Sequence, residues 1–148
     1  MASPPYSVNQ LTEIKLSWFV RFRLRSIRKK SQTGVILYGI IRTPARSMSS
    51  KAPSIAVREG SQRLGFCSPR SRLPKYAHLA PGQHNLLFRA SRPVSSSSFL
   101  ERVTLAEGDV LVAICEPVQP WVFYAKSPEM DTWYLGIIDS SGVIRSVD

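Results

Sequence analysis

The sequence predicts a mainly β protein in which a small antiparallel barrel or sandwich occupies the last third of the chain. Three observations support this fold class. Short apolar segments recur between residues 99 and 148 at a spacing of about 8–12 residues, which is typical of small all-β domains. Turn-forming residues separate them, as in Glu107-Gly108-Asp109 and Asp139-Ser140-Ser141-Gly142. Of the 148 residues, 43% are apolar and 20% are charged, a composition that supports a buried core.

Five strands are expected in this C-terminal β-domain, residues 99–148. Val110–Cys115 is apolar throughout, which is typical of a buried strand. Trp121–Lys126 and Thr132–Ile138 combine aromatic and β-branched residues, which favour strands. Shorter segments at Arg102–Leu105 and Val143–Arg145 complete the set.

One pattern in this region matches a known small fold. The turn and strand Glu107-Gly108-Asp109-Val110-Leu111 precede Trp121 and the strand Tyr134-Leu135-Gly136-Ile137-Ile138. This order and spacing resemble those of an SH3-like small barrel over residues 102–146. The chain lacks the ALYDY-like first strand of peptide-binding SH3 domains, and it lacks their proline and tyrosine after the glycine-containing strand. The resemblance therefore implies a fold and not the binding of proline-rich peptides.

Residues 1–42 are expected to form a basic N-terminal hairpin segment behind a loose first ten residues. Apolar residues alternate with mostly polar ones from residue 16 to residue 25, which indicates a strand: Leu16, Trp18, Val20, Phe22 and Leu24 on one face. Lys29-Lys30-Ser31-Gln32-Thr33-Gly34 would form the turn, and Val35–Ile41 the return strand. A helix through 11–29 is the alternative, because it would align Leu11, Ile14, Trp18 and Phe22.

Residues 43–98 are expected to be a long, irregular and flexible Ser/Pro/Arg-rich region. They contain six prolines and a run of four serines from Ser95 to Ser98, with no sustained helical or strand period. Only 54–57 and 85–89 have the pattern of short edge strands. A structureless stretch of this length is uncommon inside a compact domain, so part of it is expected to lie outside the fold.

The charge of the chain is unevenly distributed. The net charge is +10, yet residues 1–100 carry 17 Lys and Arg against two acids, and residues 101–148 carry three against eight. A basic region of this kind favours a polyanionic partner, either nucleic acid or an anionic membrane surface. Nucleic acid is favoured, because membrane binding would need the apolar face that the core uses.

The first candidate site is an arginine stripe on the expected N-terminal strand, formed by Arg21, Arg23 and Arg25. Alternate residues of a strand share one face at a spacing of about 6.5–7 Å, which suits successive phosphates, and an adjacent aromatic ring can stack on a base. A short Arg-Ser element at Ser68-Pro69-Arg70-Ser71-Arg72 extends the basic region. A solvated strand face and an ordinary linker are the alternatives. The predicted nucleic-acid-binding residues are Phe19, Arg21, Arg23, Arg25, Arg28, Lys29, Lys30, Arg70 and Arg72.

An aromatic set near the C-terminus is the second candidate site. Consecutive residues of a strand point to opposite faces, so one of Trp133 and Tyr134 is expected to point outward. Exposed aromatic residues beside Glu129 and Asp131 would form a protein-binding patch, since aromatic side chains dominate interface energetics. Packing in the core alone is the alternative. The predicted protein-interaction residues are Trp121, Tyr124, Trp133 and Tyr134.

Metal and catalytic motifs are not found in the sequence. Cys67, His78, His84 and Cys115 are all the cysteines and histidines, and their spacing lacks paired zinc knuckles, so no metal and no cofactor is predicted. Cys115 ends an apolar run and is expected in the core. The sequence lacks hydrolase, P-loop and dinucleotide-binding motifs, and an enzyme is not expected.

The expected role is that of a non-enzymatic accessory or adaptor protein that binds nucleic acid, with RNA favoured over DNA. The composition is similar to that of small RNA-virus proteins that suppress RNA silencing, support movement or bind the genome. The alternative is an SH3-like interaction or assembly subunit whose basic region serves for targeting or docking. No apolar run approaches a transmembrane length, so a soluble protein of the cytoplasm or nucleus is expected. The Arg- and Ser-rich composition leaves organelle import open.

Overall fold

The protein is mainly β, as the sequence predicts. Strands make up 67% of the residues that the computed structural model describes, and helix makes up 8%. Those residues are 6–15, 21–22, 24–26, 32–40, 54–67, 74–91, 96–117 and 130–147.

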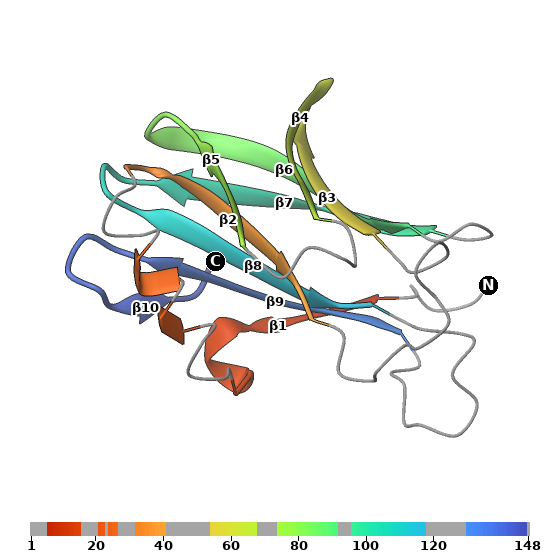
Figure 1. The fold of residues 1–148 in the computed structure, drawn as a ribbon. Helices are drawn as coiled ribbons and strands as arrows, with labels where there is room; N and C mark the ends of the chain where they lie inside the picture. The colour runs from red at the N-terminus through yellow and green to blue at the C-terminus, as the bar shows by residue number, and fades with distance from the viewer. Residues whose placement is uncertain are drawn as a thin grey trace.

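Two sheets contain all the described strands (Figure 1). Sheet A is mixed, with strand order β1-β9-β8-β2-β5 and with β10 paired to β9. β1 pairs with β9 in parallel, and so does β2 with β8. The strands of sheet A are β1 (Tyr6–Gln10), β2 (Gly34–Gly39), β5 (Lys75–His78), β8 (Val110–Glu116), β9 (Asp131–Ile138) and β10 (Ile144–Arg145). A short 3-10 helix, η1 (Leu11–Glu13), follows β1.

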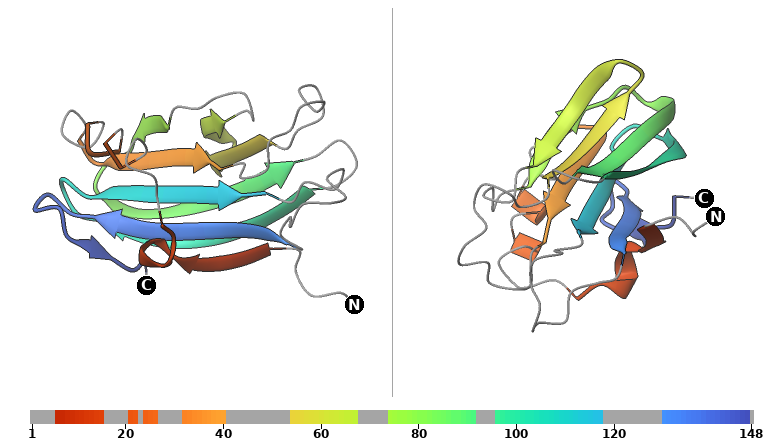
Figure 2. Two further views of the ribbon diagram at one scale, coloured as in Figure 1. Left: turned by 60° about the horizontal axis from the view of Figure 1, so that its bottom comes forward. Right: turned by 90° about the vertical axis from the view of Figure 1, so that its right-hand side faces the viewer.

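Sheet B is antiparallel throughout, with strand order β4-β3-β6-β7. Its strands are β3 (Ser54–Glu59), β4 (Gln62–Cys67), β6 (Gly82–Ser91) and β7 (Ser96–Leu105). In the right-hand view of Figure 2 the two sheets lie face to face as two layers. The main core lies between them.

Aromatic rings occupy the centre of this core. The Trp133 ring on β9 packs edge-on against two rings of sheet B, with centroid distances of 5.3 Å to Phe88 and 5.5 Å to Phe99. Phe99 also stacks on Tyr6 of β1 at 5.1 Å, so the N-terminal strand joins the same cluster. Cys115 is buried here and is a core cysteine, as predicted.

Sheet A is apolar on both faces, which explains why β8 has no polar alternation. Leu111, Ala113 and Cys115 point toward sheet B. Val110, Val112 and Ile114 point to the outer side and pack in a second cluster with residues from the N-terminal segment. Those residues are Leu11, Ile14 and Leu24. The N-terminal segment therefore covers the outer face of sheet A.

The predicted N-terminal β-hairpin is wrong. Residues 21–22 and 24–26 are helical, and β2 pairs with β5 and β8 rather than with a strand at 16–25. The strand prediction for β2 itself is confirmed. Its residues Val35 to Leu37 are buried on both faces, and a strand of that kind belongs in the middle of a sheet rather than in a two-stranded hairpin.

The prediction of an irregular region over residues 43–98 is wrong for most of its described part. β3, β4, β5, β6 and the first residues of β7 lie in this range. Pro74 and Pro81 directly precede β5 and β6, so these prolines mark turns between strands. In the four-serine run, Ser97 is buried while Ser96 and Ser98 are exposed, which is strand alternation. Residues 43–53 lie outside the described residues.

The predicted C-terminal strands are confirmed where the structure describes them, but they do not form a unit of their own. β7 belongs to sheet B, whereas β8, β9 and β10 belong to sheet A. The described strands form two open sheets and no closed barrel. The expected strand Trp121–Lys126 lies outside the described residues.

Candidate nucleic-acid interface

The outer face of sheet B collects arginines from all four of its strands. On β6, Leu86, Phe88 and Ala90 are buried toward the core, so Arg89 and its alternate neighbours point outward. Cross-strand pairing then sets which residues share this outer face, because paired residues point to the same side. We name it the arginine face, and it consists of Arg58, Arg63, Phe66, Leu87, Arg89, Leu100 and Arg102.

The register gives the arginine face a defined order. Arg58 on β3 pairs with Arg63 on one side and with Leu87 on the other, and Leu87 pairs with Leu100. A register shift between Val57 and Arg58 brings Arg63 onto this face. Along this row the β4 and β3 positions are therefore basic, and the β6 and β7 positions are apolar.

The arginines of this face have neutral partners. Nη2 of Arg58 donates to the Ser61 carbonyl at 3.0 Å. Nη2 of Arg89 donates to Ser96 Oγ at 3.4 Å, and Nε of Arg102 donates to Asn85 Oδ1 at 3.3 Å. Among the residues that the structure describes, none of these arginines forms an ion pair with an acid. Within this part of the chain, their positive charge is therefore not paired with an acid.

The acids of the same strands occupy inward positions. Glu59 follows the outward Arg58 on β3, and Glu101 pairs with the buried Leu86. Alternation therefore separates the signs of charge: the arginines point outward from sheet B and its described acids do not. A face of one sign attracts polyanions and increases their rate of association.

An exposed aromatic ring completes the arginine face. Phe66 is 43% exposed, and Cζ of Arg63 lies 5.2 Å from its ring centroid in a cation–π contact. Leu100 is 65% exposed on the opposite edge strand. An exposed ring beside arginines can stack on an unpaired base while the guanidinium groups contact phosphates.

Glu59 holds a histidine at the end of sheet B. Burial of His84 opposes its charged form, but hydrogen bonds from its ring nitrogens to the Ala80 carbonyl and to Glu59 Oε2, each 2.7 Å long, outweigh burial and raise its pKa above 6.5. The His84 ring thus links β3 to the start of β6.

This raised pKa predicts a pH-dependent stability. A pKa that is higher in the folded state contributes stability below the unfolded value of about 6.5, and the contribution is lost as pH rises through the folded pKa. We expect the free energy of unfolding of the wild type to exceed that of His84→Gln most at about pH 5.5, below the unfolded pKa, and this difference to shrink as the pH is raised toward about 8.5. Urea unfolding of both proteins across this range measures the difference, and a constant difference would contradict the assignment.

The structure places the predicted stripe residues elsewhere. Arg21 and Arg25 are exposed and helical, so the strand spacing proposed for them is wrong. They lie with Leu24 over the outer face of sheet A, on the side opposite the arginine face. The other predicted nucleic-acid-binding residues lie outside the described residues: Phe19, Arg23, Arg28, Lys29, Lys30, Arg70 and Arg72.

The predicted aromatic patch is partly corrected. Trp133 is fully buried between the sheets, so it cannot be an exposed interface residue. Tyr134 points to the other face, as alternation requires, and is half-buried against the outer cluster of sheet A. Asp131, expected beside the patch, is fully buried and accepts a short hydrogen bond from Ser97 Oγ. Trp121 and Tyr124 lie outside the described residues.

Sequence reasoning missed the arginine face. The alternation of Leu86, Phe88 and Ala90 was a usable signal, because it places Arg89 outward once residues 82–91 are read as one long strand. The pairing that adds Arg58 and Arg63 depends on a register shift that alternation does not reveal.

Within the described ranges, no three His, Cys, Asp or Glu side chains stand close enough to hold a metal ion. No helix in those ranges is both long and apolar enough to cross a membrane. Comparison with protein families, curated proteins and solved structures finds no match to this chain.

Proposed function

We propose that this chain is a non-enzymatic protein that binds single-stranded nucleic acid, RNA in preference to DNA, through the arginine face. The observation that carries the proposal is the grouping of four arginines and an exposed phenylalanine on a sheet face to which the described acids do not point. Arginine binds phosphate through a planar fork of donors and stacks on aromatic faces.

The sheet geometry supports single strands over duplex. Neighbouring strands are about 4.8 Å apart and alternate residues about 6.5–7 Å apart, so the arginines form a shallow two-dimensional array. An open sheet face accepts splayed bases, and exposed aromatic residues on such sheets stack on them. Reading a duplex would instead need an element that enters a groove, and the described part of sheet B is a broad face.

A pair of triple variants tests the proposal. The first replaces Arg63, Arg89 and Arg102 by Gln, and the second replaces Lys15, Arg21 and Arg25 by Gln. All six side chains are exposed, and each variant loses three positive charges. We expect only the first to weaken RNA binding, and its plot of log K against log salt should flatten by about 2 units on single strands. Filter binding on an unstructured RNA at several salt concentrations measures both quantities.

The opposite pattern would assign binding to the N-terminal segment and not to the arginine face. An unchanged salt slope in both variants would exclude a phosphate-binding role for either surface. Phe66→Ala adds a separate readout: it should weaken binding to single strands by about 1–3 kcal/mol and leave binding to duplex unchanged. Circular dichroism of each variant establishes that the sheets are intact.

A second class of partner is favoured by one observation. Leu100 is the most exposed large apolar side chain in the described residues, and with Leu87 it forms an apolar row between the arginines. An acidic protein surface with an apolar centre would fit this row. Leu100→Ser separates the two functions, because it should leave the salt slope of RNA binding unchanged and weaken a protein contact.

A further inference from the structure

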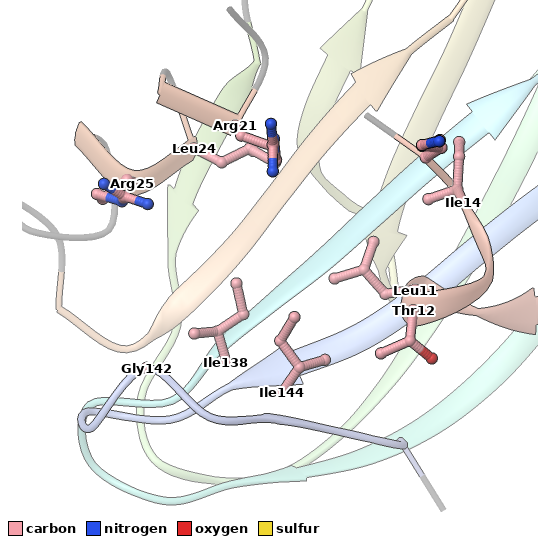
Figure 3. Close-up of a pocket in the computed structure, with 10 residues that line it drawn as sticks. Leu11, Thr12, Ile14, Arg21, Leu24, Arg25, Ile138, Gly142 and Ile144 are labelled. Carbon is pink, nitrogen blue, oxygen red and sulfur yellow. The ribbon is translucent and has the colours of Figure 1, made fainter. Parts of the chain in front are cut away.

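A pocket of about 430 Å³ lies on the outer face of sheet A, on the opposite side of the molecule from the arginine face (Figure 3). Its apolar lining comes from elements that are distant in sequence: Leu11 and Ile14 around η1, Leu24 from the helical residues, Ile138 from β9 and Ile144 from β10. Its size falls within the range of small-molecule sites, about 300–1,000 Å³.

Three cations also line this pocket. Lys15, Arg21 and Arg25 are all exposed, and in Figure 3 Arg21 and Arg25 lie on either side of Leu24 on the helical segment. Within the described residues none of the three has an acidic partner. Glu13, the nearest acid in sequence, accepts a hydrogen bond from the Gln10 amide at 2.7 Å as part of a capping box. The described residues of the pocket thus combine an apolar interior with a positive rim.

We propose that this pocket binds a free fatty acid, with the acyl chain among the leucine and isoleucine side chains and the carboxylate at Lys15, Arg21 and Arg25. An apolar chain alone would not require the cations, and an inorganic anion would not require the apolar lining. Only a ligand that has both parts complements the whole pocket. Guanidinium groups suit a carboxylate because they bind it through two parallel hydrogen bonds.

The sequence around the pocket maintains its shape. A Cβ at Gly136 would lie 2.6 Å from Leu11 Cβ, so the glycine allows η1 to approach β9 closely. At the other end, Asp139 accepts hydrogen bonds from the Ser141 and Val143 amides at 2.9 and 3.0 Å, which close the turn between β9 and β10. That turn positions Ile144 over the pocket.

Titration of the full chain with decanoate, below the concentration at which micelles form, tests the proposal. We expect saturable one-site binding by calorimetry, and each methylene added between octanoate and decanoate should tighten binding about fourfold. The variant with Arg21→Gln and Arg25→Gln should bind decanoate about tenfold more weakly. Ile144→Trp, which fills the pocket from a 43% exposed position, should abolish binding.

The matched control is the variant with Arg63→Gln and Arg89→Gln, which loses the same charge from the arginine face. It should bind decanoate like the wild type, and the pocket variants should retain RNA like the wild type. The two proposals can therefore fail independently. Four results would each overturn the fatty-acid assignment. Two concern the charge: both charge variants weaken decanoate binding equally, or decanol binds like decanoate to every variant. Two concern the ligand: acetate binds as tightly as decanoate, or the chain binds only to vesicles of anionic phospholipid.

Discussion

Replacing Trp133 by alanine is expected to lower the free energy of unfolding by about 3–5 kcal/mol. The side chain is fully buried on β9 and is the largest in the core. It contacts Phe88 and Phe99 edge-on, so its removal leaves a void that two sheets would have to close together. The loss of unfolding free energy is larger when the surrounding structure cannot close the void. Backbone pairing holds each sheet in place, so we expect the void to close only in part.

Urea unfolding measures this loss as a shift of the midpoint with an unchanged m value. Trp133→Phe is the graded control, because it keeps an aromatic ring and leaves a smaller void. Its loss should lie between those of the wild type and Trp133→Ala. A loss of under about 1 kcal/mol for Trp133→Ala would contradict the position of this ring at the centre of the core.

Replacing Gly34 by alanine is expected to cost about 3 kcal/mol, at the upper end of the range for overpacking. A Cβ at this position would lie 2.3 Å from the Ala77 carbonyl oxygen and 2.6 Å from Cε1 of Tyr76. The carbonyl belongs to the backbone of β5 and cannot rotate away. Tyr76 is also held, because its hydroxyl lies 3.1 Å from the carbonyl oxygens of Gln32 and of Thr33. The strand pair would have to separate.

Gly39→Ala on the same strand is the matched control. The nearest atom to a Cβ there is Cδ1 of Ile55 at 3.4 Å, the end of a side chain that can adjust. We expect the free energy of unfolding of this variant to lie within about 1 kcal/mol of the wild-type value. Equal losses in the two variants would show that β2 responds to any loss of glycine and not to the contact at Gly34.

The sequence predicted the parts of the fold that depend on local pattern. The continuous apolar run in β8 and the turns at Glu107-Gly108-Asp109 and Asp139–Gly142 are properties of adjacent residues, and the structure confirms them. The turn chemistry is visible in the structure too, since Asp109 accepts from the Ala106 amide and Gly108 and Gly142 have positive φ angles.

Long-range pairing explains most of the errors. Residues 16–25 alternate in hydropathy and contain aromatic and β-branched residues, but the outer face of sheet A offers Leu24 a place beside Leu11 and Ile14. Packing on that face, which no local pattern describes, outweighs strand propensity. The strands of sheet B were missed for a related reason. Their serines and the nearby prolines were interpreted as signs of irregular structure, whereas Ser96 to Ser98 pair with β6 as part of a strand.

The sequence indicated the charge of the two candidate sites but not how their residues are brought together. The positive N-terminal two thirds was a reason to seek a polyanion-binding surface, yet the arginines that share a face come from β3, β4, β6 and β7. Only the register brings them together. Arg21 and Arg25 were singled out by their charge, and the structure places both in the lining of an apolar pocket. The expected strand over residues 16–25 would not have formed this pocket.

The topology of sheet A has a consequence for how the chain is made. Tyr6 pairs with Asp131 and Gly34 with Val110, so the first strands to leave the ribosome have their partners among the last. At a synthesis rate of about 5–20 residues per second, β2 waits roughly 4–15 seconds for its partner β8 to be translated. Through that interval β5 is the one described strand available to pair with Val35 to Leu37, which are buried on both faces in the finished protein. Slower translation of the last third would lengthen this exposure, and rare codons placed there should direct more of the nascent chain into aggregates or onto chaperones.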